Sequence, residues 1–155
     1  MPNPHRIRPV EAAHIAALIE LGTETGLSHW AAHDYLSEIK AKNAIMLRLE
    51  ADANHTVGFI VGRLITAADA VGIDAEIYNI AVSPTHQRRG NGQLLFDAFF
   101  ERCREAGARR IWLEVRVSNE KAIAFYSHNS FVIQHLRKGL YHSPREDGYL
   151  MSRTL

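Results

Sequence analysis

The residue types that bind phosphate are concentrated in one short segment, Gln87-Arg88-Arg89-Gly90-Asn91-Gly92. β-rich residues 78–82 precede this segment and a long amphipathic stretch follows it, which predicts a strand, a loop and a helix in succession. The first backbone N–H groups of a helix have no partner inside it, and the helix dipole attracts an anion there. Glycine allows positive φ beside a phosphate and arginine supplies charge, so the segment is a candidate pyrophosphate site.

Two glycines two residues apart also suit an ordinary turn, so the segment alone does not decide between a turn and a phosphate site. Two common nucleotide motifs are excluded directly. A Walker loop needs Gly-Lys-Ser/Thr, which the segment lacks, and the dinucleotide fingerprint needs a third glycine or alanine where Leu95 stands.

The strand, basic glycine loop and long helix together resemble the Q-x-x-G-x-G acetyl-CoA loop of the GNAT superfamily, matched here by Gln87, Gly90 and Gly92. The resemblance continues downstream through Ile111-Trp112-Leu113-Glu114-Val115-Arg116, Asn119 and Ala122-Ile123-Ala124-Phe125-Tyr126. These segments are similar to the ribosomal-protein-alanine N-acetyltransferase branch (RimI type), whose signature reads W-L-E-V-R, then N, then A-I-x-x-Y. The resemblance implies an α/β (α+β) GNAT fold, with a mixed, mostly antiparallel sheet of six to seven strands and about four helices on both faces.

The same resemblance implies roles for individual residues. Glu114 stands at the position of the general base and contacts the substrate, Tyr126 stands at the position of the acid that protonates the departing thiolate, and Asn119 supports the site. Tyr141 matches a tyrosine that lines the peptide entrance. The acetyl-CoA contacts implied are Asn119 and Tyr126 themselves, the backbone of Ile80, Ala81 and Val82, and the residues Gln87, Arg88, Arg89, Gly90, Asn91, Gly92 and Gln93.

The chemistry of direct acetyl transfer suits these residue types. The reaction needs a neutral amine, a donor for the carbonyl oxygen and a proton for the leaving sulfur, which a Glu, a backbone amide and a Tyr can supply. A peptide α-amine has a pKa of about 8, so neutralising it near pH 7 costs roughly 1 kcal/mol, against about 4 to 5 kcal/mol for a Lys amine. A single carboxylate acting through water therefore suffices for an α-amine.

Several of these residues also have a purely structural interpretation. Glu114 lies on the strand face opposite Ile111 and Leu113 and could be a solvated sheet residue, and Tyr126 could be core packing with its hydroxyl at the rim. Cys103 lies on an apolar helix stripe, which predicts a buried thiol and argues against a covalent acetyl-Cys route. His29 and His33 have a spacing found in metal sites, but no third ligand accompanies them, so no metal is expected.

Three interpretations of the function remain open, and two of them differ in the acceptor of the acetyl group. The branch it resembles suggests the N-terminal α-amine of a protein, such as a small-subunit ribosomal protein. A small-molecule amine is the first alternative, and a non-catalytic acyl-CoA-binding sensor is the second. Segments 22–27 and 137–147, which would face the acceptor, match the family only loosely.

The hydrophobic pattern predicts the elements that must position these residues. We expect four helices, over Glu11–Leu21, Ser28–Ile39, Gly92–Ala106 and Asn119–Tyr126. Gly22 and Gly107 are expected to end the first and the third. Ser28 and Asn119 are expected to cap the second and the fourth, and Trp30 is expected to lie inside the second. Strands are expected over Ile7–Pro9, Ala44–Leu49, Val57–Ile65, Glu76–Val82, Ile111–Val117, Phe131–Leu136 and Gly148–Met151. Asn129-Ser130-Phe131 replaces the Leu-Gly-Phe turn usual in the family, and Asn129 is expected to adopt the left-handed conformation.

Composition sets the remaining bounds. The 155 residues, 46% of them hydrophobic, suit a single domain over residues 1–155. A formal charge of +1 does not favour nucleic acid as a partner, and no stretch is long and apolar enough for a signal or a membrane span. With a single cysteine, no intramolecular disulfide can form. The sequence therefore predicts a cytoplasmic monomer or dimer.

Overall fold

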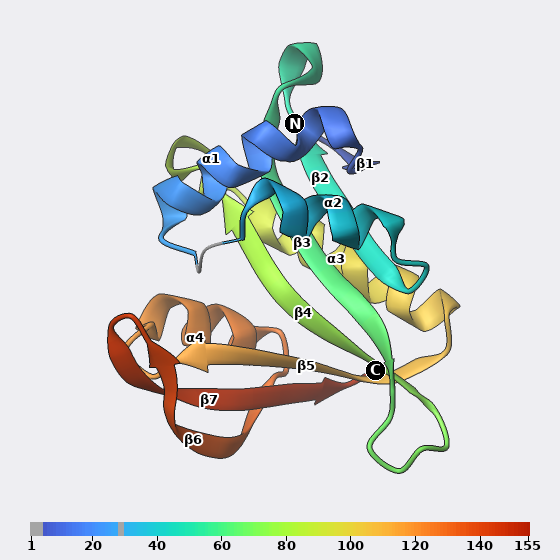
Figure 1. The fold of residues 1–155 in the computed structure, drawn as a ribbon, viewed down its shortest axis with the longest axis vertical. Coiled ribbons are helices and arrows are strands. Elements are labelled where there is room, and N and C mark those ends of the chain that lie inside the picture. The colour runs from blue at the N-terminus through green and yellow to red at the C-terminus, as the bar shows by residue number, and fades with distance from the viewer. Residues whose placement is uncertain (1–4, 28–29) are drawn as a thin grey trace.

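The computed structural model describes residues 5–27 and 30–155, which form one seven-stranded sheet with helices on both faces (Figure 1). The strand order is β1-β2-β3-β4-β5-β7-β6. The strands are β1 (Arg6–Pro9), β2 (Ala44–Glu50), β3 (Thr56–Thr66), β4 (Ile73–Val82), β5 (Ala108–Arg116), β6 (Val132–His142) and β7 (Arg145–Thr154). The α-helices are α1 (Ile15–Thr25), α2 (Ala32–Lys40), α3 (Asn91–Glu105) and α4 (Glu120–His128).

Strand pairing confirms the mixed, mostly antiparallel sheet. Strands β1 to β4 pair antiparallel in chain order, and β5, β7 and β6 form a second antiparallel group. The two groups join through β4 and β5, which run parallel because α3 returns the chain across the sheet between them. The two antiparallel groups of the sheet therefore meet at the parallel junction between β4 and β5.

Two hydrophobic cores lie on opposite faces of this sheet. Helices α1 and α2 cover one face, where Leu18, Tyr35 and Phe59 are fully or almost fully buried. Helices α3 and α4 cover the other, and α3 alone buries Leu95, Phe96, Phe99, Phe100 and Cys103. Each fully buried side chain of this size stabilises the fold by about 1.5–3 kcal/mol. Burial also raises the pKa of the Cys103 thiol to about 12, which confirms an inert, buried cysteine.

Helix α1 differs from the prediction at its end. It passes through Gly22 and stops at Gly26, which adopts the left-handed conformation with φ 71°. A helical glycine costs only about 1 kcal/mol, less than the burial of Leu18 and Leu21 contributes on the same helix. The Thr25 hydroxyl, which donates to the Leu21 carbonyl at 2.7 Å, supports the last turn.

Helix α2 begins later than predicted, at Ala32, so Trp30 precedes it instead of lying within it. The Asp34 carboxylate accepts the Ala31 N–H at 2.7 Å and fixes this start. The predicted N-cap, Ser28, lies outside the described residues, as does His29 of the histidine pair.

The turn after α4 also differs from the prediction. Ser130 has φ 68°, whereas Asn129 has φ −94°. Asn129 is buried, and its side chain donates to the Phe125 carbonyl at 3.0 Å, so this residue ends the helix while the following serine makes the turn. The strands β4 to β7 are all longer than predicted, because turn and charged residues at their ends pair within the sheet.

No helix in the described part of the chain is long and apolar enough to cross a membrane.

Candidate active site

The sheet opens between β4 and β5. The two strands pair from Ile73 and Ala108 as far as Glu76 and Trp112, and then part, while β4 runs on to Val82 and β5 to Arg116. Figure 1 shows the two strands diverging toward the end of the molecule where α4 lies. Within the described residues, the edge of β4 beyond Glu76 has no partner strand on this side, so its backbone groups are available to a ligand.

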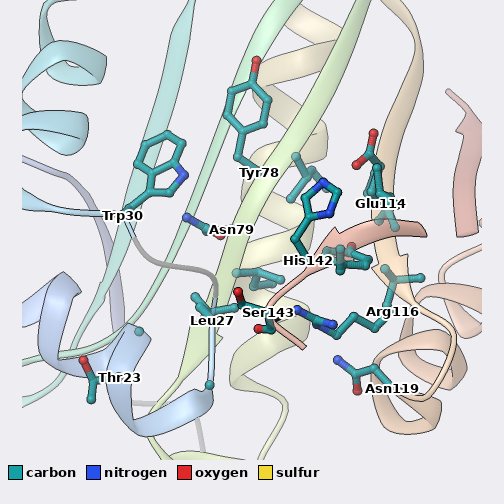
Figure 2. A pocket seen from close by; sticks show the side chains of 18 of the residues that line it. Thr23, Leu27, Trp30, Tyr78, Asn79, Glu114, Arg116, Asn119, His142 and Ser143 are labelled. Atoms are coloured by element: carbon teal, nitrogen blue, oxygen red, sulfur yellow. Dashed lines mark hydrogen bonds between the residues drawn. The ribbon is translucent and has the colours of Figure 1, made fainter. Parts of the chain in front are cut away.

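A cavity of about 800 Å³ occupies this opening (Figure 2). Its walls come from both faces of the sheet: α1, the residues that lead into α2 and Tyr35 of α2 on one side, and Tyr126 of α4 with its cap Asn119 on the other. Residues 77–80 of β4, 113–116 of β5 and 140–143 of the β6–β7 hairpin complete it. Of the residues predicted for the site, the cavity brings together Ile80, Glu114, Asn119, Tyr126 and Tyr141.

A β-bulge in β4 shapes one wall. Val61 of β3 pairs with Asn79 and Gly62 pairs with Ile77, which leaves Tyr78 without an opposite residue. Consecutive strand residues normally point to opposite faces, but the extra residue sets Tyr78 and Asn79 on the same side, toward α1 and α2. Figure 2 shows both side chains at the cavity, beside Trp30.

Tyr126 enters the cavity from the opposite face. Its ring stacks on Phe96 with centroids 5.8 Å apart and also contacts Phe131, so the core holds the side chain in place. Burial is the main cause that raises the pKa of its phenol to about 12, and the neighbouring Tyr141 adds to the effect. The phenol therefore keeps its proton throughout the neutral range and is available as a proton donor.

Glu114 lies on β5 and reaches the cavity from its open side. Ile111, Leu113 and Val115 are buried toward α3, and Glu114 points the other way, as the alternation predicted. Its side chain is 33% exposed, and Arg137 of β6 donates to its Oε1 at 3.1 Å. Its charge raises the pKa of Glu76 and of Tyr141, although burial is the larger cause for both. The carboxylate is thus held at the cavity while remaining accessible to water.

The β6–β7 hairpin is tied to β5 by Arg116. This guanidinium donates to the Pro144 carbonyl at 2.9 Å, to the Glu146 carboxylate at 3.2 Å and to the Ser143 carbonyl at 3.3 Å. It also lies over the Tyr141 ring, 4.2 Å from the centroid. These contacts hold Tyr141 at the cavity wall, which a loop tyrosine alone would not guarantee.

Asn119 begins α4, as predicted. Its side-chain oxygen accepts the Ala122 N–H at 3.3 Å, and the residue also lines the cavity. The cap fixes the first turn of the helix that carries Tyr126. The resemblance gave Asn119 a supporting role, and this helix cap is consistent with such a role.

The basic glycine loop lies outside the cavity, at the start of α3. Arg88 and Gly90 both have positive φ, 60° and 79°, and the arginines 88 and 89 are exposed. Such a conformation turns successive N–H groups toward one point, and the N-terminus of the 15-residue helix α3 adds its partial positive charge. Gly92 is already helical, and a Cβ there would make an ordinary van der Waals contact, 3.4 Å from the Phe125 ring.

The polar side chains of this loop form hydrogen bonds within the protein that fix the conformation of the loop. Gln87 donates to the Val82 carbonyl at 2.8 Å, which ties the loop to the end of β4, and Asn91 donates to the His86 carbonyl at 2.8 Å. Gln93 donates to Asp97 and to Asn129, at 2.8 and 2.7 Å. Ala81 and Val82 have buried side chains, so only their backbone is available to a ligand. The cofactor contacts of all these residues stay predictions.

Most residues of the cavity wall were not identified from the sequence as site residues, among them Trp30, Tyr78 and Asn79. Tyr35, which lies in the helix predicted over Ser28–Ile39, also lines the cavity. Aromatic residues are as typical of core packing as of a binding site, so their residue types alone did not identify them as part of the cavity. Among the described residues, His, Cys, Asp and Glu side chains form no group of three that could hold a metal ion.

The sequence pattern of the acetyltransferase (GNAT) family matches residues 15–131. The chain belongs to this family. It is similar to the ribosomal protein bS18-alanine N-acetyltransferase of Haemophilus influenzae, with 30% identity over 149 residues that cover 94% of the chain and 96% of that relative. The enzyme of the same name from Escherichia coli (strain K12) is 37% identical over 81 residues, which cover 51% of the chain and 55% of that relative.

The matched segment thus spans about half the length of the Escherichia coli relative. The likeness in fold extends further. The crystal structure of the ribosomal-protein-S18-alanine N-acetyltransferase from Escherichia coli superposes with a TM-score of 0.83 and 25% identity, over 97% of this chain and 93% of that one. The family match covers β2 to β5, the opening between β4 and β5 and the loop before α3, and the likeness in fold extends to the rest of the sheet.

Proposed function

We propose that the protein, as a single domain, transfers the acetyl group of acetyl-CoA to the N-terminal α-amine of a protein or peptide. The observation that carries the proposal is the cavity at the opening between β4 and β5, which is lined by residues from both faces of the sheet, Glu114 and Tyr126 among them. Its relatives are named for acetylation of an alanine on a ribosomal protein. An acceptor of that class would place the reaction in the cytoplasm.

The residues present fit acetyl-CoA. The loop with positive φ at Arg88 and Gly90 and the N-terminus of α3 suit the pyrophosphate, and the unpaired edge of β4 from Ile77 to Val82 suits the amide-bearing pantetheine arm. When bound, acetyl-CoA supplies an activated acetyl group. Arg88 and Arg89 contribute charge from an exposed position, so the affinity is expected to decrease as salt increases.

Glu114 and Tyr126 divide the proton transfers between them. Glu114, which faces water and the acceptor side, takes the proton from the α-amine, directly or through one water molecule. Tyr126, which keeps its proton because burial raises its pKa to about 12, gives that proton to the sulfur as it leaves. Donation to the acetyl oxygen as it gains charge falls, in this proposal, to backbone N–H groups on the unpaired edge of β4.

The deciding experiment mixes the protein with acetyl-CoA and peptides that begin with alanine or with other residues. Release of free thiol and mass spectrometry of the peptide follow the reaction, and the same peptide with a blocked N-terminus is the control. The proposal expects one acetyl group on the α-amine of the free peptide only. Thiol release with a small amine such as a polyamine, but with no peptide, would refute the peptide assignment. Binding of acetyl-CoA without any turnover would indicate a sensor.

A further inference from the structure

The Glu114 carboxylate, the base of the proposed reaction, has a single polar partner within the protein. Arg137 of β6 donates to its Oε1 at 3.1 Å, and no other group of residues 5–27 and 30–155 forms a hydrogen bond or an ion pair with this side chain. The contact is reciprocal, because the Arg137 side chain has no second polar partner in the same part of the chain. One guanidinium is therefore dedicated to one oxygen of the carboxylate, and Oε2 is left for the cavity.

Arg137 makes this contact from two strands away. β7 lies between β6 and β5, and Gly148 of β7 pairs with Arg137 on one side and with Arg116 on the other. Paired residues point to the same face of a sheet, as do residues two apart on a strand, so Arg137, Arg116 and Glu114 share the face of the acceptor. The Arg137 side chain therefore reaches across β7, past a glycine that has no side chain to block it.

The backbone that carries Arg137 is anchored directly after it. β6 and β7 change register between Arg137 and Tyr141, where Gly139 adopts φ 64° and donates its N–H to the Asp147 carboxylate at 2.8 Å. A Cβ on Gly148 would lie 2.9 Å from the Tyr141 ring, so the bulge sets this ring close over β7. One anchored stretch of the hairpin thus carries both the arginine that contacts the base and the tyrosine that lines the cavity.

The ion pair matters more for geometry than for the stability of the fold. The side chains of Arg137 and Glu114 are 53% and 33% exposed, and pairs this exposed contribute little to stability because water screens their charges. A glutamate side chain, however, has several rotatable bonds, and a base must come within about 2.6–3.2 Å of the proton that it takes. A displacement of about 1 Å in a reacting group can cost about 100-fold in rate, so a contact that fixes one oxygen also aims the other.

We propose that Arg137 is a positioning residue: its guanidinium holds Oε1 of Glu114 and thereby aims Oε2 at the acceptor amine. This inference rests on the proposed function. In the step that it serves, a proton passes from the acceptor nitrogen to Oε2, directly or through one water molecule. An N–H bond breaks, an O–H bond forms, and the nitrogen keeps the electron pair that then attacks the acetyl carbon. Arg137 itself exchanges no proton, because a guanidinium stays charged in proteins.

The test removes the guanidinium and then returns it from solution. Arg137→Ala and Arg137→Met both delete the group, and Met keeps most of the length of the side chain. Guanidinium chloride, far below the concentrations that unfold proteins, offers the lost cation to the exposed site of Arg137→Ala. Arg109→Ala is the matched control, because Arg109 is 52% exposed and pairs with Asp69 at 3.0 Å, away from the cavity. The assay uses an alanine-initiated peptide, with calorimetry for acetyl-CoA.

Both deletions should lower kcat about five- to thirtyfold, while the affinity for acetyl-CoA and the KM for the peptide change by less than about threefold. Guanidinium should raise the kcat of Arg137→Ala at least about threefold and leave the unmodified protein and Arg109→Ala unchanged. A variant without the base has nothing to aim, so adding Arg137→Ala to Glu114→Gln should lower kcat by less than about twofold more.

Circular dichroism identifies which variants are folded, and either folded deletion decides the matter. A kcat within about twofold of the unmodified protein, a loss that guanidinium does not reduce in Arg137→Ala, or a loss that persists in full beside Glu114→Gln would overturn this inference alone. Failure of the unmodified protein to acetylate any peptide would instead overturn the proposed function.

Discussion

Replacing Tyr126 with Phe removes one hydroxyl group and leaves the packing of the ring unchanged. The contacts to Phe96 and Phe131 involve the ring alone, so the fold and the affinity for acetyl-CoA should be preserved. A positioned proton donor contributes about 10²–10⁴ to a rate, and water in the open cavity can replace part of it. We therefore expect kcat to decrease about ten- to a thousandfold, which corresponds to about 1.4–4 kcal/mol in the activation free energy.

The pH dependence gives a second measurement on the same residue. Burial raises the pKa of Tyr126 from 10.0 to about 12, so the donor form is present below that value and is lost only as pH rises through it. Tyr126 should therefore cause no loss of activity on the alkaline side up to about pH 10. A descending limb at lower pH must come from another group, and it should persist in Tyr126→Phe.

The assay follows thiol release at saturating acetyl-CoA, with calorimetry to measure the affinity for the cofactor. Tyr149→Phe is the matched control: Tyr149 is a partly buried tyrosine on β7 that packs on the same core but does not line the cavity. The control should retain full turnover. Turnover of Tyr126→Phe within twofold of the unmodified protein, or a loss explained by weaker cofactor binding, would refute the assignment of Tyr126 as proton donor.

Four further substitutions test other parts of the structure. Glu114→Gln keeps a hydrogen-bond partner for Arg137 but cannot accept a proton. The value of kcat/KM for a peptide should therefore decrease at least tenfold near pH 7, and by less at a pH where the α-amine is already neutral. An equal loss at both pH values would contradict the role of Glu114 as base. Gly90→Val places a β-branched residue at φ 79°, a conformation that it adopts only with strain, so the loop should change shape in a protein that is still folded. Calorimetry should then detect little or no binding of acetyl-CoA. Normal affinity would exclude the loop as the phosphate site. Gly62→Ala would push a Cβ into the Glu76 carbonyl and the Phe99 ring, and it should lower the free energy of unfolding in urea by roughly 1–3 kcal/mol. In Gly22→Ala the new Cβ meets only Leu27, at 3.9 Å, so this change should raise the free energy of unfolding by about 0.5–1 kcal/mol.

Local patterns were enough to predict the elements that carry the site. The alternation from Ile111 to Val115 predicted β5 and the outward direction of Glu114, because the strand period is fixed by backbone geometry. The apolar spacing after Gly92 predicted α3 to within one residue at each end, and Asn119 was correctly identified as a helix cap. Each of these signals operates over a few residues, within reach of periodicity and capping rules.

Helix ends and turns were predicted less well, since several residues could terminate each element. Gly22 was an acceptable place for α1 to end, but packing of Leu18 and Leu21 carried the helix on to Gly26. Similarly, Ser130 and not Asn129 adopts the left-handed conformation after α4, because the Asn129 side chain donates to the Phe125 carbonyl and ends the helix. In both cases tertiary burial or a side-chain hydrogen bond decided between local alternatives of similar energy.

The sequence by itself determined the family motif, and it predicted the anion-binding loop before α3 and Glu114 and Tyr126 as the proton-transferring pair, because each rests on residue types at short spacing. The tertiary structure alone decided where β4 and β5 separate and which side chains face the opening. The bulge at Tyr78 inserts one residue into a regular alternation and turns Asn79 toward Tyr35 on α2, far away in the chain. Such a bulge depends on the register with β3, a long-range pairing that no local pattern of apolar residues encodes.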